Sequence, residues 1–208
     1  MHLFDYLDSG NGYKVRLLLA QLGQAYDWTE LDIDAGKTRT PEFLTRNPNG
    51  RVPTLELDDG TNLAESNAIL WYLAEGTSFV PADRLGRGQV LQWMFFEQYS
   101  HEPYVATPRY IVKHLPKDHP RHAEVPDRLA RGRAAFEVME THLAARQFFV
   151  AERYGIADIA LYAYTHVAHE GGHDLTPYAQ INAWLARVAA EPRHVKLMAR
   201  PAATAHGR

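Results

Sequence analysis

The spacing of apolar residues changes about one third of the way along this chain. Near the start, short apolar runs at residues 3–6 and 26–33 flank the segment 13–22, whose apolar residues recur at helical spacing. Turn-forming residues at 8–12 precede this segment, and Gly23 stands where a helix would end. A strand, a helix and a second strand are therefore predicted, and such a crossover joins parallel strands.

The next forty residues predict a second helix, a hairpin and a third helix. Thr40 followed by Pro41 is typical of a helix start, and Asn47-Pro48 ends that helix. Residues 54–57 and 61–64 flank an Asp-Asp-Gly turn, which indicates a hairpin. Ser66 then opens a helix, so the predicted order is β-α-β-α-β-β-α.

Beyond residue 82 only helical spacing is found. It covers residues 85–99, 126–145, 156–169 and 178–190, whereas the proline-rich stretch 114–126 is expected to be an exposed loop. An α/β part followed by an all-helical part predicts two domains. We place the first at 1–76, a linker at 77–81 and the helical domain at 82–208.

Composition excludes several classes of function. The formal net charge of −3 gives no electrostatic basis for binding nucleic acid or an anionic membrane. The chain has no cysteine, which excludes disulfides, thiolate metal sites and a cysteine nucleophile. It has no signal-like N-terminus, and no apolar run approaches the roughly 20 residues of a membrane span. We therefore expect a soluble, cytoplasmic protein.

Two motifs around the predicted hairpin form a receptor for a small peptide. The first is the run 49–55, in which Val52-Pro53 directly precedes a strand. We predict a cis bond there, which would leave the backbone of Val52 open to pair with a peptide ligand. The second is Glu65-Ser66, where the N–H groups of a helix start and a hydroxyl can hold a carboxylate.

These motifs, in this spacing, resemble the signature of the cytosolic glutathione transferases. The resemblance extends to the helical part, where residues 156–160 and 181–184 look like two helix starts of that family. Gly155 departs from the pattern, because the family has a serine or threonine there and glycine offers no capping side chain. The resemblance implies a thioredoxin-like domain, a helical bundle domain, a homodimer, and glutathione as co-substrate with no cofactor.

The resemblance also assigns the parts of glutathione to residues of this chain. The γ-glutamyl carboxylate would meet Glu65 and Ser66, and the cysteinyl backbone would pair with Val52 beside Pro53. The glycyl end would lie near Arg51 and either Lys37 or Thr38.

Activation of the glutathione thiol is expected in the turn after the first strand. Only a few per cent of an ordinary thiol of pKa about 8.5 is ionised at neutral pH, so donors must stabilise the thiolate. Ser9 and Asn11 lie in this turn, and the run 9–15 looks most like the bacterial Nu-type branch of the family. Tyr6 is the alternative, because other branches use a tyrosine at the end of the first strand.

The second substrate is predicted to bind between the domains, where Tyr6, Tyr104 and Arg109 are candidates for lining its pocket. The expected reaction is conjugation of glutathione to a small electrophile. The alternatives are a glutathione-dependent disulfide or peroxide reductase without a protein cysteine, and a non-catalytic ligand-binding module. No metal site is predicted: His166, His169 and His173 have helical spacing, but the Gly171-Gly172 pair breaks the helix before the third.

Overall fold

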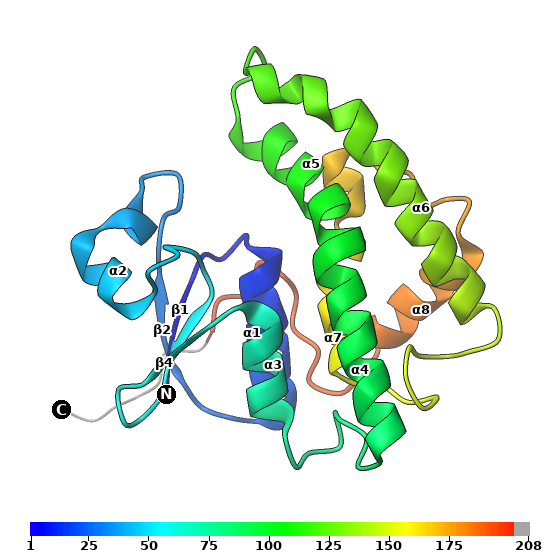
Figure 1. Ribbon diagram of the computed structural model, residues 1–208, viewed down its shortest axis with the longest axis horizontal. Coiled ribbons are helices and arrows are strands. Elements are labelled where there is room, and N and C mark those ends of the chain that lie inside the picture. Colours follow the sequence, from blue (N-terminus) through cyan, green and yellow to red (C-terminus); the bar gives the residue numbers. More distant parts are fainter. Residues whose placement is uncertain (202–208) are drawn as a thin grey trace. The chain divides into compact units, whose positions relative to one another are not determined.

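The computed structural model of the protein describes residues 1–201, whose contacts form two compact units (Figure 1). Unit 1 contains residues 1–75 and the described residues from 192 onward, and unit 2 contains residues 76–191. The sequence-based division differs at the C-terminal end, because it gives residues after 191 to the helical domain. Of that predicted domain, residues 202–208 lie outside the described part of the chain.

Unit 1 is the α/β unit that the sequence predicts, with the thioredoxin-like order of elements. Its sheet has the strand order β2-β1-β3-β4, in which β1 and β2 are parallel and the other neighbours are antiparallel. The strands are β1 (His2–Asp5), β2 (Asp27–Glu30), β3 (Thr54–Glu56) and β4 (Asn62–Ala64). The helices are α1 (Gly10–Leu22), η1 (Lys37–Arg39), α2 (Pro41–Arg46) and α3 (Ser66–Ala74).

The helix ends of unit 1 follow from local chemistry. Gly23 ends α1 in the left-handed conformation with φ 68°, which glycine adopts without steric cost. Thr40 caps α2 by accepting a hydrogen bond from the N–H of Phe43, and Pro41 occupies the first helical position. Both features confirm the predicted boundaries.

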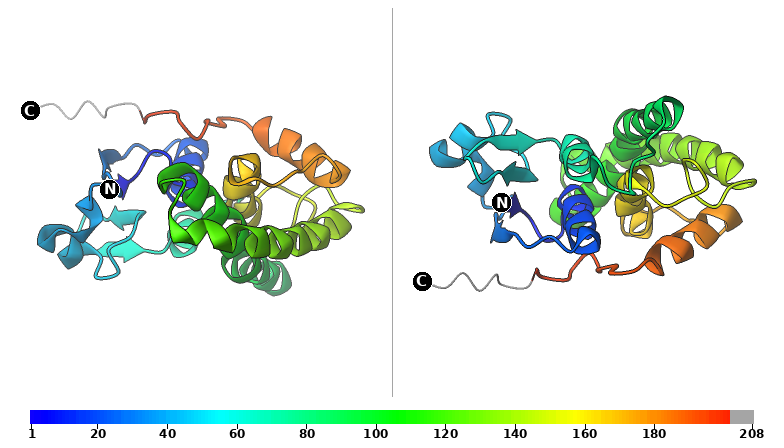
Figure 2. Two further views of the ribbon diagram at one scale, coloured as in Figure 1. Left: turned by 90° about the horizontal axis from the view of Figure 1, so that it is seen from above. Right: turned by 90° about the horizontal axis from the view of Figure 1, so that it is seen from below.

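Helix α1 is the central helix of unit 1. It packs against α3 (Figure 2). Every residue from Gly12 to Leu19 is buried. The chain segment after residue 192, red in Figure 2, runs along α1. The hydroxyl of Tyr13 donates to the carbonyl of Val195 at 2.7 Å, and Leu197 is buried. These contacts explain why this segment groups with unit 1.

Unit 2 is helical throughout, as the sequence predicts. Its main helices are α4 (Arg84–Phe96), α5 (Glu102–His114), α6 (Val125–Leu143), α7 (Ile156–Thr165) and α8 (Ala179–Ala189). The short helical turns are η2 (Glu97–His101), η3 (Pro120–Glu124) and η4 (Ala168–Gly171).

Helix α5 is an element that the sequence-based prediction missed. Pro103 lies in its first turn, directly after the turn η2. Pro108 lies inside it, and such a residue normally breaks a helix. Packing overrides this local preference, because α5 lies against α6 and η4 and buries Val105 and Ile111.

The start of α7 shows how the chain compensates for Gly155. The carbonyl of Phe79 accepts from the N–H of Ile156 at 3.1 Å, so a backbone oxygen pairs with the first N–H of the helix. A Cβ atom on residue 155 would lie 2.6 Å from that oxygen, which leaves room only for glycine. The predicted linker 77–81 therefore packs within unit 2.

Candidate functional site

The turn between β1 and α1 holds Ser9 as the N-cap of α1. Its Oγ accepts from the N–H of Gly12 at 3.2 Å. This cap uses a lone pair of the oxygen, so the hydroxyl hydrogen is not consumed by it. Ser9 is half-buried and lies at the positive end of the α1 dipole. The same side chain can thus cap the helix and donate to an anion.

The structure brings Asn11 together with Ser66, although they are 55 residues apart. The hydroxyl of Ser66 donates to Oδ1 of Asn11 at 3.1 Å. The ammonium of Lys14 lies 3.4 Å from the same Ser66 oxygen, and Lys14 is fully buried. The N-terminal turns of α1 and α3 are therefore joined by a hydrogen-bonded cluster of three side chains, which we call the Lys14–Ser66–Asn11 chain.

Tyr6 lies in surroundings that disfavour its ionisation. Partial burial raises its pKa above the usual value, and nearby carboxylates add to the effect. A phenol that ionises less readily is a weaker hydrogen-bond donor to a thiolate. The carboxylates concerned belong to Asp34, Asp8, Asp32 and Glu30.

A buried ion pair lies next to the turn between β1 and α1. Arg16 Nε donates to Asp5 Oδ2 at 2.8 Å, and both side chains are almost fully buried. Burial raises the pKa of Asp5 to about 6 in spite of the opposing charge of Arg16. The guanidinium also donates to the carbonyls of Leu7 at 2.6 Å and Leu197 at 2.7 Å. Arg16 therefore links the turn between β1 and α1 to the C-terminal segment.

Gly12 is required by the same ion pair. A Cβ atom at this position would overlap the carboxylate of Asp5, which lies directly against the first turn of α1. Glycine therefore lets the buried carboxylate approach the helix backbone.

The loop that precedes β3 is organised by a buried asparagine. The Asn47 amide nitrogen donates to the carbonyl of Arg51 at 2.9 Å and to Oγ1 of Thr54 at 3.1 Å. Its oxygen accepts from the N–H of Asn49 at 3.0 Å. The Val52-Pro53 bond within this loop is cis, as predicted.

The three residues predicted to lie near the glycyl end of glutathione differ in exposure. Lys37 and Arg51 are exposed, whereas Thr38 is buried. The turn η1 reaches the β3 loop, because Arg39 donates to the carbonyl of Asn49 at 2.9 Å. Of the three predicted residues, Lys37 and Arg51 are therefore the ones whose side chains are accessible to a carboxylate.

Glu65 adopts a strained backbone conformation directly before α3. Its φ of 68° lies in a region that a residue with a side chain rarely occupies. Such strain costs on the order of 1–3 kcal/mol and clusters at ligand-binding positions. The N–H groups of α3 begin at the next residue, Ser66, which is buried.

Comparison with known proteins identifies the family. The model of the glutathione S-transferase N-terminal domain matches residues 1–75, and that of the C-terminal domain matches residues 93–192. A glutathione S-transferase structure from Pseudomonas fluorescens Pf-5 is 51% identical, covers 95% of this chain and 98% of its own, and superimposes with a TM-score of 0.91. The chain belongs to the glutathione S-transferase family.

The chain is also similar to two more distant proteins. A glutathione transferase from Burkholderia graminis, solved with two glutathione molecules bound per subunit, is 26% identical with a TM-score of 0.81. It covers 92% of this chain and 84% of its own. The transcriptional regulator URE2 of Saccharomyces cerevisiae is 27% identical over 94% of this chain and 67% of its own length.

Tyr104 and Arg109, the two residues of unit 2 that we predicted to line the second-substrate pocket, both have contacts within unit 2. Arg109 is buried and pairs with Glu170 at 2.8 Å, and Lys113 pairs with the same carboxylate. These cations hold the pKa of Glu170 below its usual value against the opposing effect of burial. The Tyr104 ring lies under the guanidinium of Arg131. Each side chain thus has a structural role in the bundle.

Of the three histidines considered for a metal site, His166 and His173 bind separate backbone carbonyls. Helix α7 ends at Thr165, and Gly172 takes a left-handed conformation, so they do not share one helix. His166 bonds to the carbonyl of Tyr162, and His173 bonds to that of Tyr104, each at 2.9 Å. Within residues 1–201 no group of three or more histidine, aspartate or glutamate side chains could hold a metal ion.

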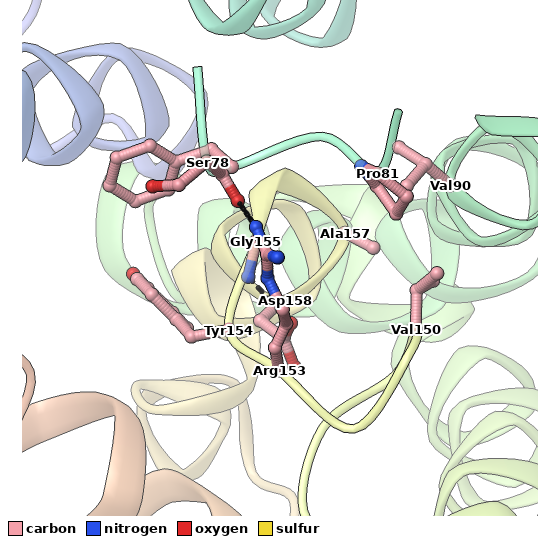
Figure 3. Close-up of a pocket in the computed structure, with 10 residues that line it drawn as sticks. Ser78, Pro81, Val90, Val150, Arg153, Tyr154, Gly155, Ala157 and Asp158 are labelled. Carbon is pink, nitrogen blue, oxygen red and sulfur yellow. Dashed lines mark hydrogen bonds between the residues drawn. The ribbon is translucent and has the colours of Figure 1, made fainter. Parts of the chain in front are cut away.

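A small pocket at the start of α7 belongs to the structural framework of unit 2 (Figure 3). Asp158 borders it and accepts from the N–H of Gly155, and Arg153 donates to the carbonyl of Ser78 (Figure 3). The other lining residues are mostly apolar: Phe79, Pro81, Val90, Val150, Tyr154 and Ala157.

Sequence reasoning missed four buried polar residues that lie at or beneath the candidate site, namely Asp5, Lys14, Arg16 and Asn47. A signal for two of them was present. Lys14 and Arg16 interrupt the apolar run 13–19, and the structure buries this run on all sides. Charged residues are rarely buried without a partner, so their position in such a run marks a buried network.

None of the helices within residues 1–201 has the length and apolar character of a membrane-spanning helix.

Proposed function

We propose that the chain is a glutathione-dependent transferase that presents the thiolate of glutathione to a small electrophile. The observation that carries this proposal is the junction of α1 and α3. Ser9 and Asn11 stand at the start of one helix and Ser66 at the start of the other, with Ser66 bonded to Asn11. Two positive helix ends and several donors thus converge within unit 1, as an anionic tripeptide requires.

In this proposal, unit 1 holds glutathione along its length. The γ-glutamyl carboxylate meets the first N–H groups of α3 after Glu65, and the cysteinyl backbone pairs with Val52. The glycyl carboxylate lies near the exposed Arg51 and Lys37. The thiol then reaches the turn of Ser9 and Asn11, where it loses its proton to solvent.

The choice between activating residues leads to a prediction. Ser9→Ala and Asn11→Ala are each expected to raise the pKa of enzyme-bound glutathione by about one to two units, because each removes a donor to a charged sulfur. Tyr6→Phe should raise it less, since the Tyr6 hydroxyl is a poor acid. The measurement is thiolate absorbance of the complex against pH. A largest shift for Tyr6→Phe would favour the tyrosine branch over the Nu-type turn.

A side-by-side assay tests the function itself. The purified protein is given glutathione with a chloronitrobenzene electrophile, with a glutathionylated disulfide, and with an organic hydroperoxide. Conjugation should exceed both reductions. Reduction without conjugation would instead support the reductase alternative, which the two glutathione molecules bound to the Burkholderia graminis relative also favour. Glutathione binding without any turnover would support the binding module, and similarity to the regulator URE2 favours that candidate.

The dimer expectation leads to a second prediction. Leu91 and Phe95 are exposed apolar residues of α4 spaced four apart, so they share one face of the helix, and exposed Tyr99 follows in η2. We expect this face to be covered by a second copy of the chain. Light scattering should give twice 23.6 kDa for the natural protein and the monomer mass for Phe95→Glu. If Phe95→Glu keeps the dimer mass of the wild-type protein, the interface lies elsewhere.

A further inference from the structure

The C-terminal segment of residues 192–201 lies along α1 and is bound there by two side chains of that helix (Figure 2). The hydroxyl of Tyr13 donates to the carbonyl of Val195 at 2.7 Å. The guanidinium of Arg16 donates through Nη1 to the carbonyl of Leu197, also at 2.7 Å. A carbonyl oxygen only accepts and a guanidinium only donates, so chemistry fixes the direction of these hydrogen bonds.

The same guanidinium also binds the turn that joins β1 to α1. Its Nη2 donates to the carbonyl of Leu7 at 2.6 Å, and its Nε donates to the carboxylate of Asp5 at 2.8 Å. The N–H groups of a guanidinium lie in one rigid plane, so a single group sets the turn and the C-terminal segment relative to each other. Arg16 is 1% exposed, and hydrogen bonds shielded from solvent in this way are the stronger ones.

Leu7 contributes the peptide group that decides the shape of this turn. The N–H of Ser9 donates to the carbonyl of Tyr6 at 2.9 Å, which closes a four-residue turn over residues 6–9. The peptide that follows Leu7 is the central one of the turn, and its orientation distinguishes one turn type from another. Because Arg16 binds the carbonyl of that peptide, it restrains the turn to one conformation. Ser9, the last residue of the turn, is thereby held at the start of α1.

We propose that the C-terminal segment, acting through Arg16, positions Ser9 against the thiolate of bound glutathione. This inference rests on the proposed function, because it assumes that glutathione is the ligand. A donor stabilises an anion most when it is already in place, since ordering it afterwards uses up part of the gain. Arg16 is a positioning residue in this arrangement, because it acts on the thiolate through the turn. The thiol site of unit 1 thus depends on Leu197, which lies 181 residues beyond Arg16.

Two adjacent residues of the C-terminal segment provide a matched pair of variants. Leu197 is 6% exposed, whereas Met198 is 58% exposed. An aspartate at position 197 must either be buried without a partner, which is costly, or lift the segment off α1. The same aspartate at position 198 stays in solvent. The two variants carry the same added charge one position apart, so the difference between them isolates the docking of the segment.

The test reads the pKa of enzyme-bound glutathione from thiolate absorbance against pH. Leu197→Asp should raise this pKa by about one unit, because a loosened turn holds the Ser9 donor less well. Met198→Asp should leave it unchanged. In a Ser9→Ala background, Leu197→Asp should add little, since the segment acts through Ser9. A wild-type pKa in Leu197→Asp, or shifts that add fully in the double variant, would overturn the inference.

Hydrogen exchange of the free protein gives a second readout that needs no glutathione. The N–H of Ser9 closes the turn, so its exchange should become several-fold faster in Leu197→Asp and stay unchanged in Met198→Asp. Unchanged exchange in Leu197→Asp would show that the segment does not restrain the turn.

A milder variant decides the question if Leu197→Asp does not fold, as judged by circular dichroism. Tyr13→Phe removes one hydrogen bond to the C-terminal segment and should move both readouts in the same direction, with the exposed Tyr72→Phe as control. A wild-type protein that binds no glutathione by calorimetry would refute the proposed function. Normal binding with an unchanged thiol pKa in the folded variants would refute only this inference.

Discussion

Replacing Asp158 by alanine is expected to destabilise the protein by about 3–5 kcal/mol. The Asp158 carboxylate is fully buried at the start of α7 and accepts three hydrogen bonds. The donors are the N–H groups of Phe149 and Gly155, both at 3.1 Å, and the indole of Trp184 at 2.9 Å. Alanine leaves all three without an acceptor, and each buried orphan donor costs about 1–3 kcal/mol.

Urea denaturation followed by circular dichroism measures this loss. Asp158→Asn should lower the free energy of unfolding less, by about 1–3 kcal/mol. Its amide oxygen can still accept from Phe149 and Trp184, so its NH₂ group faces only the N–H of Gly155. The exposed Asp118→Ala is the control and should change stability little. If Asp158→Ala is as stable as this control, the carboxylate does not hold the bundle together.

The pH dependence of stability offers an independent check on Asp158. Burial raises its pKa from 3.8 to about 7, so the folded protein binds this proton more tightly than the unfolded chain. The contribution of Asp158 is therefore greatest in acid and falls as the pH rises from about 4 through about 7. Asp158→Asn should lack this part of the pH dependence.

Arg16→Met is expected to destabilise the protein by about 3–5 kcal/mol near neutral pH. The guanidinium neutralises the buried carboxylate of Asp5 and holds the carbonyls of Leu7 and Leu197. Methionine fills much of the same space but leaves a buried charge without its counter-charge. A matched control is Arg133→Met, which removes an exposed guanidinium from α6.

The loss in Arg16→Met should depend on pH with a defined sign. The charge and the hydrogen bond of Arg16 both lower the pKa of Asp5, so removing them moves it above about 6. The folded variant must then protonate Asp5, which costs more free energy as the pH rises. Denaturation in mildly alkaline buffer should show a larger difference from the wild type than in slightly acidic buffer. A difference that grows in acid would contradict this assignment.

Much of the fold could be predicted because its signals are local. The left-handed Gly23, the Thr40-Pro41 helix start and the Asp-Asp-Gly turn each depend on the conformational preferences of a few neighbouring residues. The change from mixed to purely helical spacing likewise indicated the two parts, and the Val-Pro and Glu-Ser motifs located the candidate glutathione site.

The remaining features depend on contacts between residues far apart in the chain. Helix α5 persists around Pro108 because its packing outweighs local propensity. The C-terminal segment joins unit 1 because Tyr13 and Arg16 bind its carbonyls across separations of 182 and 181 residues.

The sequence by itself determined which side chains are candidates for activating a thiol, since hydroxyl and amide groups in a turn at a helix start are visible in the order of residues. Only the tertiary structure decided how they are held. The packing of α3 on α1 places the Ser66 hydroxyl on Asn11 and buries Lys14 behind it, and no local preference encodes that juxtaposition. At the start of α7 the fold likewise brings the carbonyl of Phe79 to the N–H of Ile156, a contact between residues 77 positions apart that no local preference encodes.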